Sequence, residues 1–238
     1  MNALKEAAGE LCRRLGQMPI RYRIICFDMD KTLLNSSNTH IAAWHTAASQ
    51  TNQQFPDDPP IRITPEFEHG QDGISNDDAV RLLNLDPNSE KGRMLIGFKK
   101  RAAVAGVSQA RWFDNAVAAL PVLHSRGYKL RIVTSSQREL VERVLEAQPS
   151  LKLLLSSITG REDYPRGKPY PDCLIAAATA SGLDVADVLY VGDHPVDYQC
   201  TRNAGCAFLL YSPNGEPDDQ TLKGVPSVTT HLDIWRYL

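Results

Sequence analysis

The pattern of hydrophobic and polar residues predicts alternating strands and helices over most of the chain. Short apolar runs bounded by turn residues predict strands at 23–27, 129–133, 151–155 with Ile158, 188–191, 206–210 and 225–228. Apolar residues at helical spacing between these runs predict helices at 114–126, 137–147, after Pro171, at 195–204 and at 231–238. Strands that alternate with helices favour an α/β fold with a Rossmann-like, doubly wound parallel sheet.

The segment between the first two predicted strands is predicted to be wholly helical. It contains helical patterns at 39–50, 76–85 and 89–105, and it spans about 75 residues, which is too long for a loop. We therefore expect an inserted all-helical cap domain. The predicted division is an N-terminal helical extension at 1–22, a core domain formed by 23–36 and 112–238, and a cap domain at 37–111.

Composition narrows the class of protein and its partners. The chain has 238 residues, 42% of them hydrophobic and 23% charged, which is ordinary for a globular protein. The net charge of −2 gives no reason to expect nucleic acid or a membrane as partner, and no apolar run approaches the roughly 20 residues of a membrane helix. Five scattered cysteines form no Cys-x-x-Cys pair, and no secretory leader is apparent. A cytoplasmic setting is therefore expected.

Two acids, Asp28 and Asp30, follow the first predicted strand. Alternation along an extended backbone sends both side chains toward the same side. Like charges at short range raise each other's proton affinity, so a divalent cation or a shared acid–base task would explain the pair. A simple strand-to-turn junction is the alternative, because Asp is common in turns. Thr134 and Asp193 also follow predicted strands, at the edge where parallel sheets bind ligands.

Four motifs, in order, resemble those of the haloacid dehalogenase (HAD) superfamily. They are Asp28-Met29-Asp30-Lys31-Thr32, then Thr134-Ser135-Ser136, then Lys168 within 167–172, and Gly192-Asp193 followed by Asp197. Between about residues 168 and 206 the chain is similar to the phosphoglycolate phosphatase-like subgroup. The resemblance implies a HAD core with a helical cap.

The resemblance also implies a reaction, which is Mg²⁺-dependent hydrolysis of a small phosphomonoester through an aspartyl phosphate. Asp30 argues against dehalogenase and phosphonatase activity, because those members lack an acid at this position. In the implied reaction, Asp28 is the nucleophile and Asp30 is the general acid/base. The implied phosphate-binding residues are Thr134, Ser135 and Lys168. The implied metal ligands are the side chains of Asp28 and Asp193 and the backbone carbonyl of Asp30, and Asp197 is a supporting residue.

The chain departs from the subgroup at Lys31, where Gly is usual, and at His194, where Ser is more usual. Lys31 is expected to face solvent or to attract an anionic substrate at the mouth of the site, and His194 to begin a helix. Substrate choice is expected to depend on the cap, with its loop at 73–78. Its basic residues either form a solvated helix face or meet a second anionic group; they are Lys91, Arg93, Lys99, Lys100 and Arg101.

Two alternative functions remain open on the sequence. A phosphosugar mutase would use the same core residues and return the phosphoryl group to a sugar. A non-catalytic regulatory or binding protein could keep the scaffold alone. A nucleic-acid phosphatase is disfavoured because the chain has no basic stripe interleaved with aromatic residues. The sequence indicates neither the particular phosphate ester nor the oligomeric state.

Overall fold

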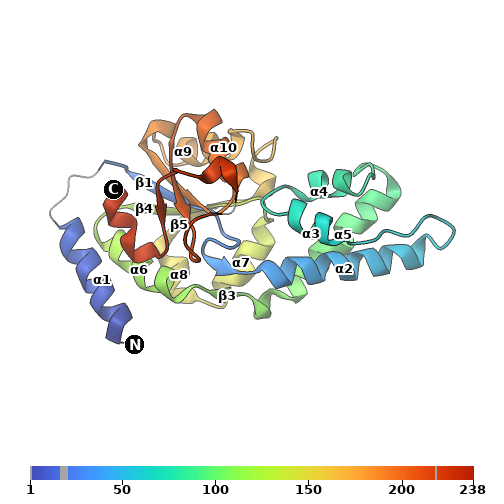
Figure 1. Ribbon diagram of the computed structural model, residues 1–238, viewed down its shortest axis with the longest axis horizontal. Helices are drawn as coiled ribbons and strands as arrows, with labels where there is room; N and C mark the ends of the chain where they lie inside the picture. The colour runs from blue at the N-terminus through green and yellow to red at the C-terminus, as the bar shows by residue number, and fades with distance from the viewer. Residues whose placement is uncertain (1, 17–20, 218) are drawn as a thin grey trace.

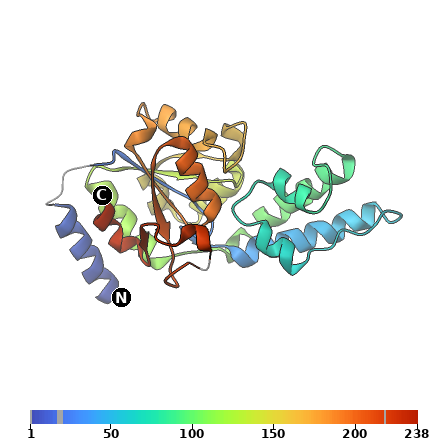
Figure 2. The same ribbon diagram turned by 45° about the horizontal axis from the view of Figure 1, so that its top comes forward.

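The computed structural model describes residues 2–16, 21–217 and 219–238. Its centre is a six-stranded sheet with the order β5-β4-β1-β6-β7-β8, and all its neighbouring strands are parallel. Helices flank this sheet, and a separate group of helices projects from one side of it (Figure 1). The same arrangement is visible after a 45° turn (Figure 2). The predicted α/β fold with a Rossmann-like parallel sheet is confirmed.

Starting from β1, the chain adds strands first toward one edge of the sheet and then toward the other. The strands are β1 (Ile24–Phe27), β4 (Lys129–Val133), β5 (Leu155–Thr159), β6 (Val188–Gly192), β7 (Ala207–Tyr211) and β8 (Ser227–Val228). The chain runs from β1 to β4 and β5 on one side, and then returns to β6, β7 and β8 on the other. The reversal of direction beside β1 is the kind of switch point at which such sheets bind ligands.

Helices cover both faces of the sheet. They are α1 (Asn2–Leu15), α6 (Asp114–Ser125), α7 (Arg138–Glu146), α8 (Pro149–Leu154), α9 (Asp172–Ala180), α10 (Pro195–Ala204) and the 3₁₀ helix η5 (His231–Tyr237). In β1, Ile25 and Phe27 join the larger hydrophobic cluster, whereas Ile24 and Cys26 join the cluster beneath α9 and α10. Each fully buried aliphatic or aromatic side chain contributes about 1.5–3 kcal/mol. Burial on both faces explains why the strands are continuously apolar.

The projecting helices have a hydrophobic cluster of their own. They are α2 (Ser37–Gln54), α3 (Pro65–Gly70), α4 (Asn76–Leu82) and α5 (Glu90–Ala105). Trp44 of α2 packs edge-on against Phe67 of α3, with ring centroids 5.3 Å apart, and Leu95 of α5 joins them. At their base, β2 (Leu34–Asn35) pairs antiparallel with β3 (Arg111–Trp112). The helices thus form a cap, and its boundaries at residues 37 and 111 stay predictions.

The structure corrects two of the predicted elements and adds a helix that was not predicted. Residues 151–154 belong to α8, which begins with Pro149 in its first turn, so the strand predicted from residue 151 begins only at Leu155. The sequence interpretation missed α3, although Thr64 accepts a hydrogen bond from the Phe67 N–H and Pro65 begins the helix. The closing helix at 231–237 is a 3₁₀ helix. Residue 1 and residues 17–20 of the predicted N-terminal extension lie outside the described residues.

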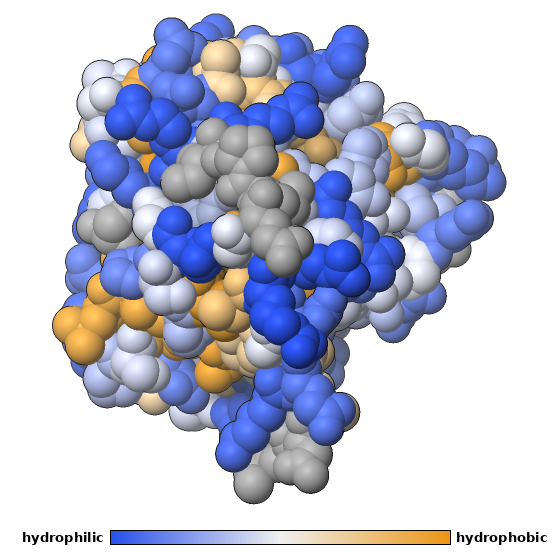
Figure 3. All heavy atoms as spheres, turned by 90° about the vertical axis from the view of Figure 1, so that its left-hand side faces the viewer, coloured by the Kyte–Doolittle hydropathy of each residue, from blue (hydrophilic) through white to orange (hydrophobic). Residues whose placement is uncertain are grey.

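The N-terminal helix α1 packs on the core, and Leu11 and Leu15 are part of the larger cluster. Arg126, just after α6, donates a hydrogen bond to the backbone carbonyl of Leu15 at 2.7 Å. Seen from the side that carries α1, the surface is mainly hydrophilic, with hydrophobic residues gathered toward the left of the view (Figure 3). Among the described helices, none combines the length and the apolar character needed to cross a bilayer.

The burial of His231 makes the stability of the fold depend on pH. Its side chain is buried, contacts Asn115 at 2.6 Å and packs against Tyr211 with ring centroids 4.1 Å apart. Burial lowers the pKa of His231 to about 3. The unfolded chain therefore binds a proton that the folded chain does not bind between about pH 6.5 and pH 3.

We expect His231 to reduce the free energy of unfolding by about 1.4 kcal/mol for each pH unit below about pH 6. Urea denaturation at pH 7, 6 and 5 measures this slope in the wild type and in His231→Gln, which keeps a polar side chain but does not titrate. The difference between the two slopes gives the contribution of His231 to the pH dependence, separate from that of the other titrating groups. Parallel slopes would contradict the assignment.

Candidate active site

The carboxyl ends of three neighbouring strands bring the predicted site residues together. Asp28 follows β1, Thr134 follows β4 and Asp193 follows β6, and β1 pairs with both of the other strands. Asp197 lies in the first turn of α10, and its carboxylate accepts a hydrogen bond from the His194 N–H at 3.2 Å. The sheet therefore brings Asp28 to side chains that follow it by more than a hundred residues in the chain.

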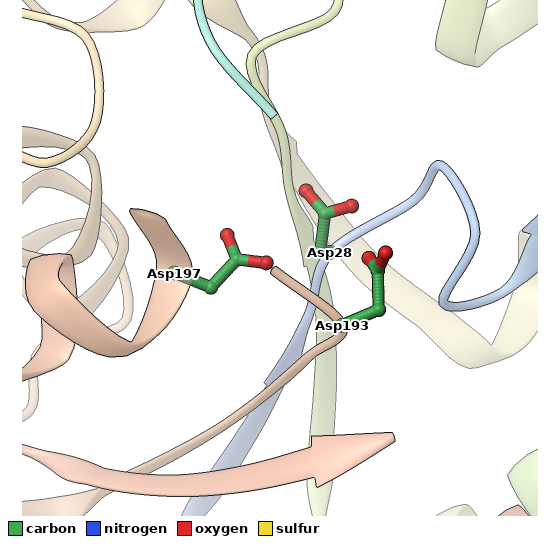
Figure 4. A group of neighbouring side chains, drawn as sticks. All are labelled: Asp28, Asp193 and Asp197. Atoms are coloured by element: carbon green, nitrogen blue, oxygen red, sulfur yellow. The ribbon is translucent and has the colours of Figure 1, made fainter. Parts of the chain in front are cut away.

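Three of these acids form a cluster that can hold a cation. One carboxylate oxygen each from Asp28, Asp193 and Asp197 lies within 4.8 Å of the others. Figure 4 shows Asp28 and Asp193 side by side, with Asp197 reaching toward them from α10. Burial, followed by the charge of Asp197, raises the pKa of Asp193 well above its usual range, and burial raises the pKa of Asp28 to about 7. A bound cation would offset the burial of these carboxylates and the repulsion between their charges, and so keep them ionised.

Lys168 supplies the fixed positive charge of the cluster. Its side chain is buried, and its ammonium group donates to Asp28 at 2.7 Å, to Asp197 at 2.6 Å and to the hydroxyl of Tyr190 at 2.5 Å. Burial opposes the charge, but Asp197 and Asp28 outweigh it and hold the pKa of Lys168 well above its usual range. The Tyr190 hydroxyl in turn donates to the Val133 carbonyl at 2.9 Å. The lysine is therefore held in one position.

The carboxylate of Asp30 accepts hydrogen bonds from both the core and the cap. Ser36 donates at 2.6 Å, Ser136 at 2.8 Å and His40 at 2.9 Å, and His40 lies in the cap helix α2. Burial alone would raise the pKa of Asp30, but its contact with His40 and its hydrogen bonds from the two hydroxyls lower it below its usual range. Asp30 is thus stabilised as a carboxylate in this conformation.

The other predicted phosphate-binding residues line the cavity between the core and the cap. Thr134 and Ser135 both do so, and the Ser135 hydroxyl donates to the Gly73 carbonyl of the cap loop at 3.1 Å. Gly73 has φ +69°, and a Cβ atom there would lie 2.8 Å from the Val196 side chain, so only glycine fits this contact. Cap loop and core therefore touch directly beside the predicted phosphate site.

Lys31 and His194 have defined places in the site. Lys31 has φ +58°, a left-handed conformation that explains why glycine is usual here in the subgroup it resembles. Its ammonium group pairs with Asp72 of the cap loop, and both side chains line the cavity. His194 begins α10, as predicted, and accepts a hydrogen bond from the Val196 N–H at 3.3 Å.

Sequence reasoning missed several residues of the site. Tyr190 lies inside an apolar strand and gave no separate signal. His40 lies in a helical pattern of the cap and belongs to none of the four motifs. Ser36 belongs to no motif, and Ser136 lies in the second motif without a role of its own. Of the five basic cap residues named above, only Lys99 and Lys100 line the cavity. Lys91 instead pairs with Asp58 at 3.3 Å.

Fold and site together define a class of protein. The class is a Rossmann-like α/β enzyme with an acidic site at the strand ends and a helical cap above it. The sequence pattern of the haloacid dehalogenase-like hydrolases matches residues 25–211, and the chain belongs to this family.

Named relatives agree with this assignment. The chain is 28% identical to a phosphoglycolate phosphatase of Vibrio cholerae over 201 residues, which cover 82% of this chain and 88% of that protein. It is 26% identical to a phosphoglycolate phosphatase of Haemophilus influenzae over 203 residues, or 81% and 86% of the two chains. A solved hydrolase structure from Pseudomonas syringae superposes with a TM-score of 0.75 at 24% identity, over 90% and 97% of the two chains. The predicted family and the predicted class of enzyme, a phosphatase of that family, are confirmed.

Proposed function

We propose that this chain is a Mg²⁺-dependent phosphatase that hydrolyses a small phosphomonoester through an aspartyl phosphate on Asp28. The observation that carries the proposal is the contact between Lys168 and Asp28 beside the carboxylates of Asp193 and Asp197. Such a site combines a nucleophile, a fixed cation and a set of hard oxygen ligands. These are the parts that transfer of an anionic phosphoryl group requires.

Mg²⁺ fits the donor set because it prefers carboxylate and carbonyl oxygens. Its ligands would be the side chains of Asp28 and Asp193 and the backbone carbonyl of Asp30, and when bound it would neutralise charge on the transferring phosphoryl group. Asp197 is already held by Lys168 and by the His194 N–H, which suits a supporting position.

The side chains have distinct tasks in the proposed reaction. An oxygen of Asp28 attacks phosphorus while the ester P–O bond breaks, and Asp30 passes a proton to the leaving oxygen. Asp30 must take up that proton from water before this step, because Ser36, Ser136 and His40 hold it ionised in the conformation described above. Thr134, Ser135 and Lys168 hydrogen-bond the phosphoryl oxygens. Water then attacks phosphorus of the aspartyl phosphate and Asp30 takes a proton from that water. The bond between the Asp28 oxygen and phosphorus breaks, which releases inorganic phosphate and restores the Asp28 carboxylate. The three donors around Asp30 support the second step, because they stabilise its ionised form.

The names of the relatives indicate which substrate to test first. Because relatives at 28% and 26% identity are named phosphoglycolate phosphatases, we propose a small, phosphoglycolate-like ester as substrate. The mutase alternative would use the same core residues, so it differs in the fate of the phosphoryl group. The cytoplasmic setting stays a prediction.

Phosphate release from phosphoglycolate, several sugar phosphates and a nucleoside monophosphate, with Mg²⁺ and with EDTA, tests the proposed function. We expect release that requires Mg²⁺, because four buried or half-buried acids surround the phosphate site and repel an anionic substrate without a cation. Zinc-free buffers and a re-addition of Mg²⁺ after EDTA serve as controls. Folded protein that releases phosphate from no compound would contradict a phosphatase, and a stable phosphorylated protein would then favour a mutase.

A further inference from the structure

Lys99 is a buried lysine of the cap that lines the cavity above the phosphate site. Its exposed fraction is 7%, whereas its neighbour Lys100 is exposed. Lys168, the other buried lysine of the site, contacts two carboxylates. Within the described residues, Lys99 has no carboxylate within 4 Å, and its one hydrogen-bond partner is Nδ1 of His40 at 3.2 Å. Lys99 is therefore a buried cation without an anion.

The surroundings of Lys99 nevertheless support its charge. The ammonium group lies 5.4 Å from the ring centre of Trp44, which is a cation–π distance. The Trp44 ring is fixed in turn by its N–H, which donates to Gln71 at 3.0 Å. Burial lowers the pKa of Lys99 to about 8, so the side chain still carries its charge at neutral pH. Holding an unpaired charge in a buried place is costly, and the cost is recovered when an anion binds there.

The position of Lys99 relative to Asp30 determines how long a leaving group must be to contact both residues. A lysine ammonium can only donate, so His40 accepts at Nδ1 and donates from Nε2 to Asp30 at 2.9 Å. Lys99 is thus two hydrogen bonds away from the carboxylate that would protonate the leaving oxygen. A leaving group with a second anionic group a few bonds from that oxygen can span this interval.

We propose that Lys99 binds a second anionic group on the leaving part of the substrate, either a carboxylate or a second phosphate. This inference rests on the proposed phosphatase function and names the residue that determines specificity within it. The protein would then favour short, doubly anionic phosphate esters over esters with a neutral end. The other basic residues at this end of the site do not offer the same subsite, because Lys31 pairs with Asp72 and Lys100 is exposed.

A series of two-carbon phosphate esters measures how a second charge on the leaving group affects the rate. The compounds are 2-phosphoglycolate, ethylene glycol bisphosphate and 2-hydroxyethyl phosphate, which end in a carboxylate, a phosphate and a neutral hydroxyl. We expect wild-type kcat/KM to be at least tenfold higher for one of the two charged esters than for the neutral one. The first two compounds distinguish a carboxylate site from a phosphate site.

Substitution of Lys99 tests whether this residue causes the preference for an ester with a second anionic group. In Lys99→Met we expect the preference for the charged ester to fall to threefold or less, mainly through a higher KM for that ester. The neutral ester should lose less activity, and the part it loses reflects the contact of Lys99 with His40. Lys99→Arg, which keeps the charge, should retain most of the preference. Lys91→Met is the matched control, because Lys91 lies on the same helix and pairs with Asp58 away from the cavity.

The outcomes separate this inference from the proposed function. If the wild type hydrolyses the neutral ester as well as both charged ones, the role of Lys99 is wrong and the phosphatase assignment stands. If Lys99→Met keeps the full preference, or Lys100→Met removes it, the subsite lies elsewhere. If the wild type releases phosphate from no ester at all, the proposed function itself fails. Should Lys99→Met not fold, Lys99→Gln replaces it in the same comparison, because Gln is uncharged but keeps a polar end that can contact His40, and retention of the full preference in Lys99→Gln would equally overturn the role of Lys99.

Discussion

Asp28→Asn is expected to lower phosphate release by at least about 10⁴-fold, because an amide does not attack phosphorus and the variant also loses a negative metal ligand. The fold should remain, since the amide of this variant would still offer an oxygen to Lys168, and the substitution removes a buried carboxylate whose pKa burial raises. The melting temperature should therefore stay the same or rise. Initial rates of phosphate release and thermal melts of the same preparations measure both effects.

Asp58→Asn is a suitable control for this experiment. Asp58 is an exposed acid of the cap that pairs with Lys91, and its substitution should change the rate by less than about twofold. Activity of Asp28→Asn clearly above that of a mock-purified sample would remove Asp28 from the role of nucleophile. A large fall in its melting temperature would instead show that the charge of Asp28 is needed for folding.

Lys168→Met is expected to damage both catalysis and stability. The variant loses the fixed cation that contacts Asp28, which should lower kcat by about 10²–10³-fold. It also leaves Asp28 and Asp197 buried without their cation, and breaking a buried ion pair in this way costs about 3–5 kcal/mol. Urea denaturation in EDTA and initial rates in saturating Mg²⁺ measure the two effects separately.

A double variant distinguishes lost charge pairing from lost packing. Lys168→Met combined with Asp28→Asn contains one buried carboxylate fewer, so it should be more stable than Lys168→Met alone while remaining inactive. Packing damage would persist in the double variant. Equal instability of the single and double variants would thus contradict the account of Lys168 as the partner of a buried acid.

The main residues of the site could be predicted because they follow apolar strands. In a parallel sheet, the polar residue that ends each strand lies at a common edge, so Asp28, Thr134 and Asp193 had to converge once the strands were assigned correctly. The position of Lys168 came from a resemblance rather than from periodicity. The structure brings it to within hydrogen-bond distance of Asp28. The chemical roles of these residues stay predictions.

The contacts of the cap with the core could not be predicted. The approach of His40 to Asp30 depends on how α2 leaves the sheet, and no local pattern encodes that angle. Lys99 shows the same difficulty, since a lysine on a helix is usually solvated and only its packing against Trp44 reveals that it is buried. The error at 151–154 has a different cause. A short apolar run fits a strand and a buried helix equally well, and Pro149 decided for the helix.

We expect the pairing of β2 with β3 to influence the order in which the molecule folds. In the central sheet, Ile24 of β1 pairs with Lys129 of β4, so this ladder joins residues separated by the whole cap. Closing so long a loop is entropically costly and slow. The helices of the cap share a hydrophobic cluster of their own, in which α2 and α5 join the two halves of the insert, and the β2–β3 pair holds both ends of the insert together. We therefore expect the insert to fold before β1 pairs with β4, and the closed insert to shorten the loop that this pairing must close.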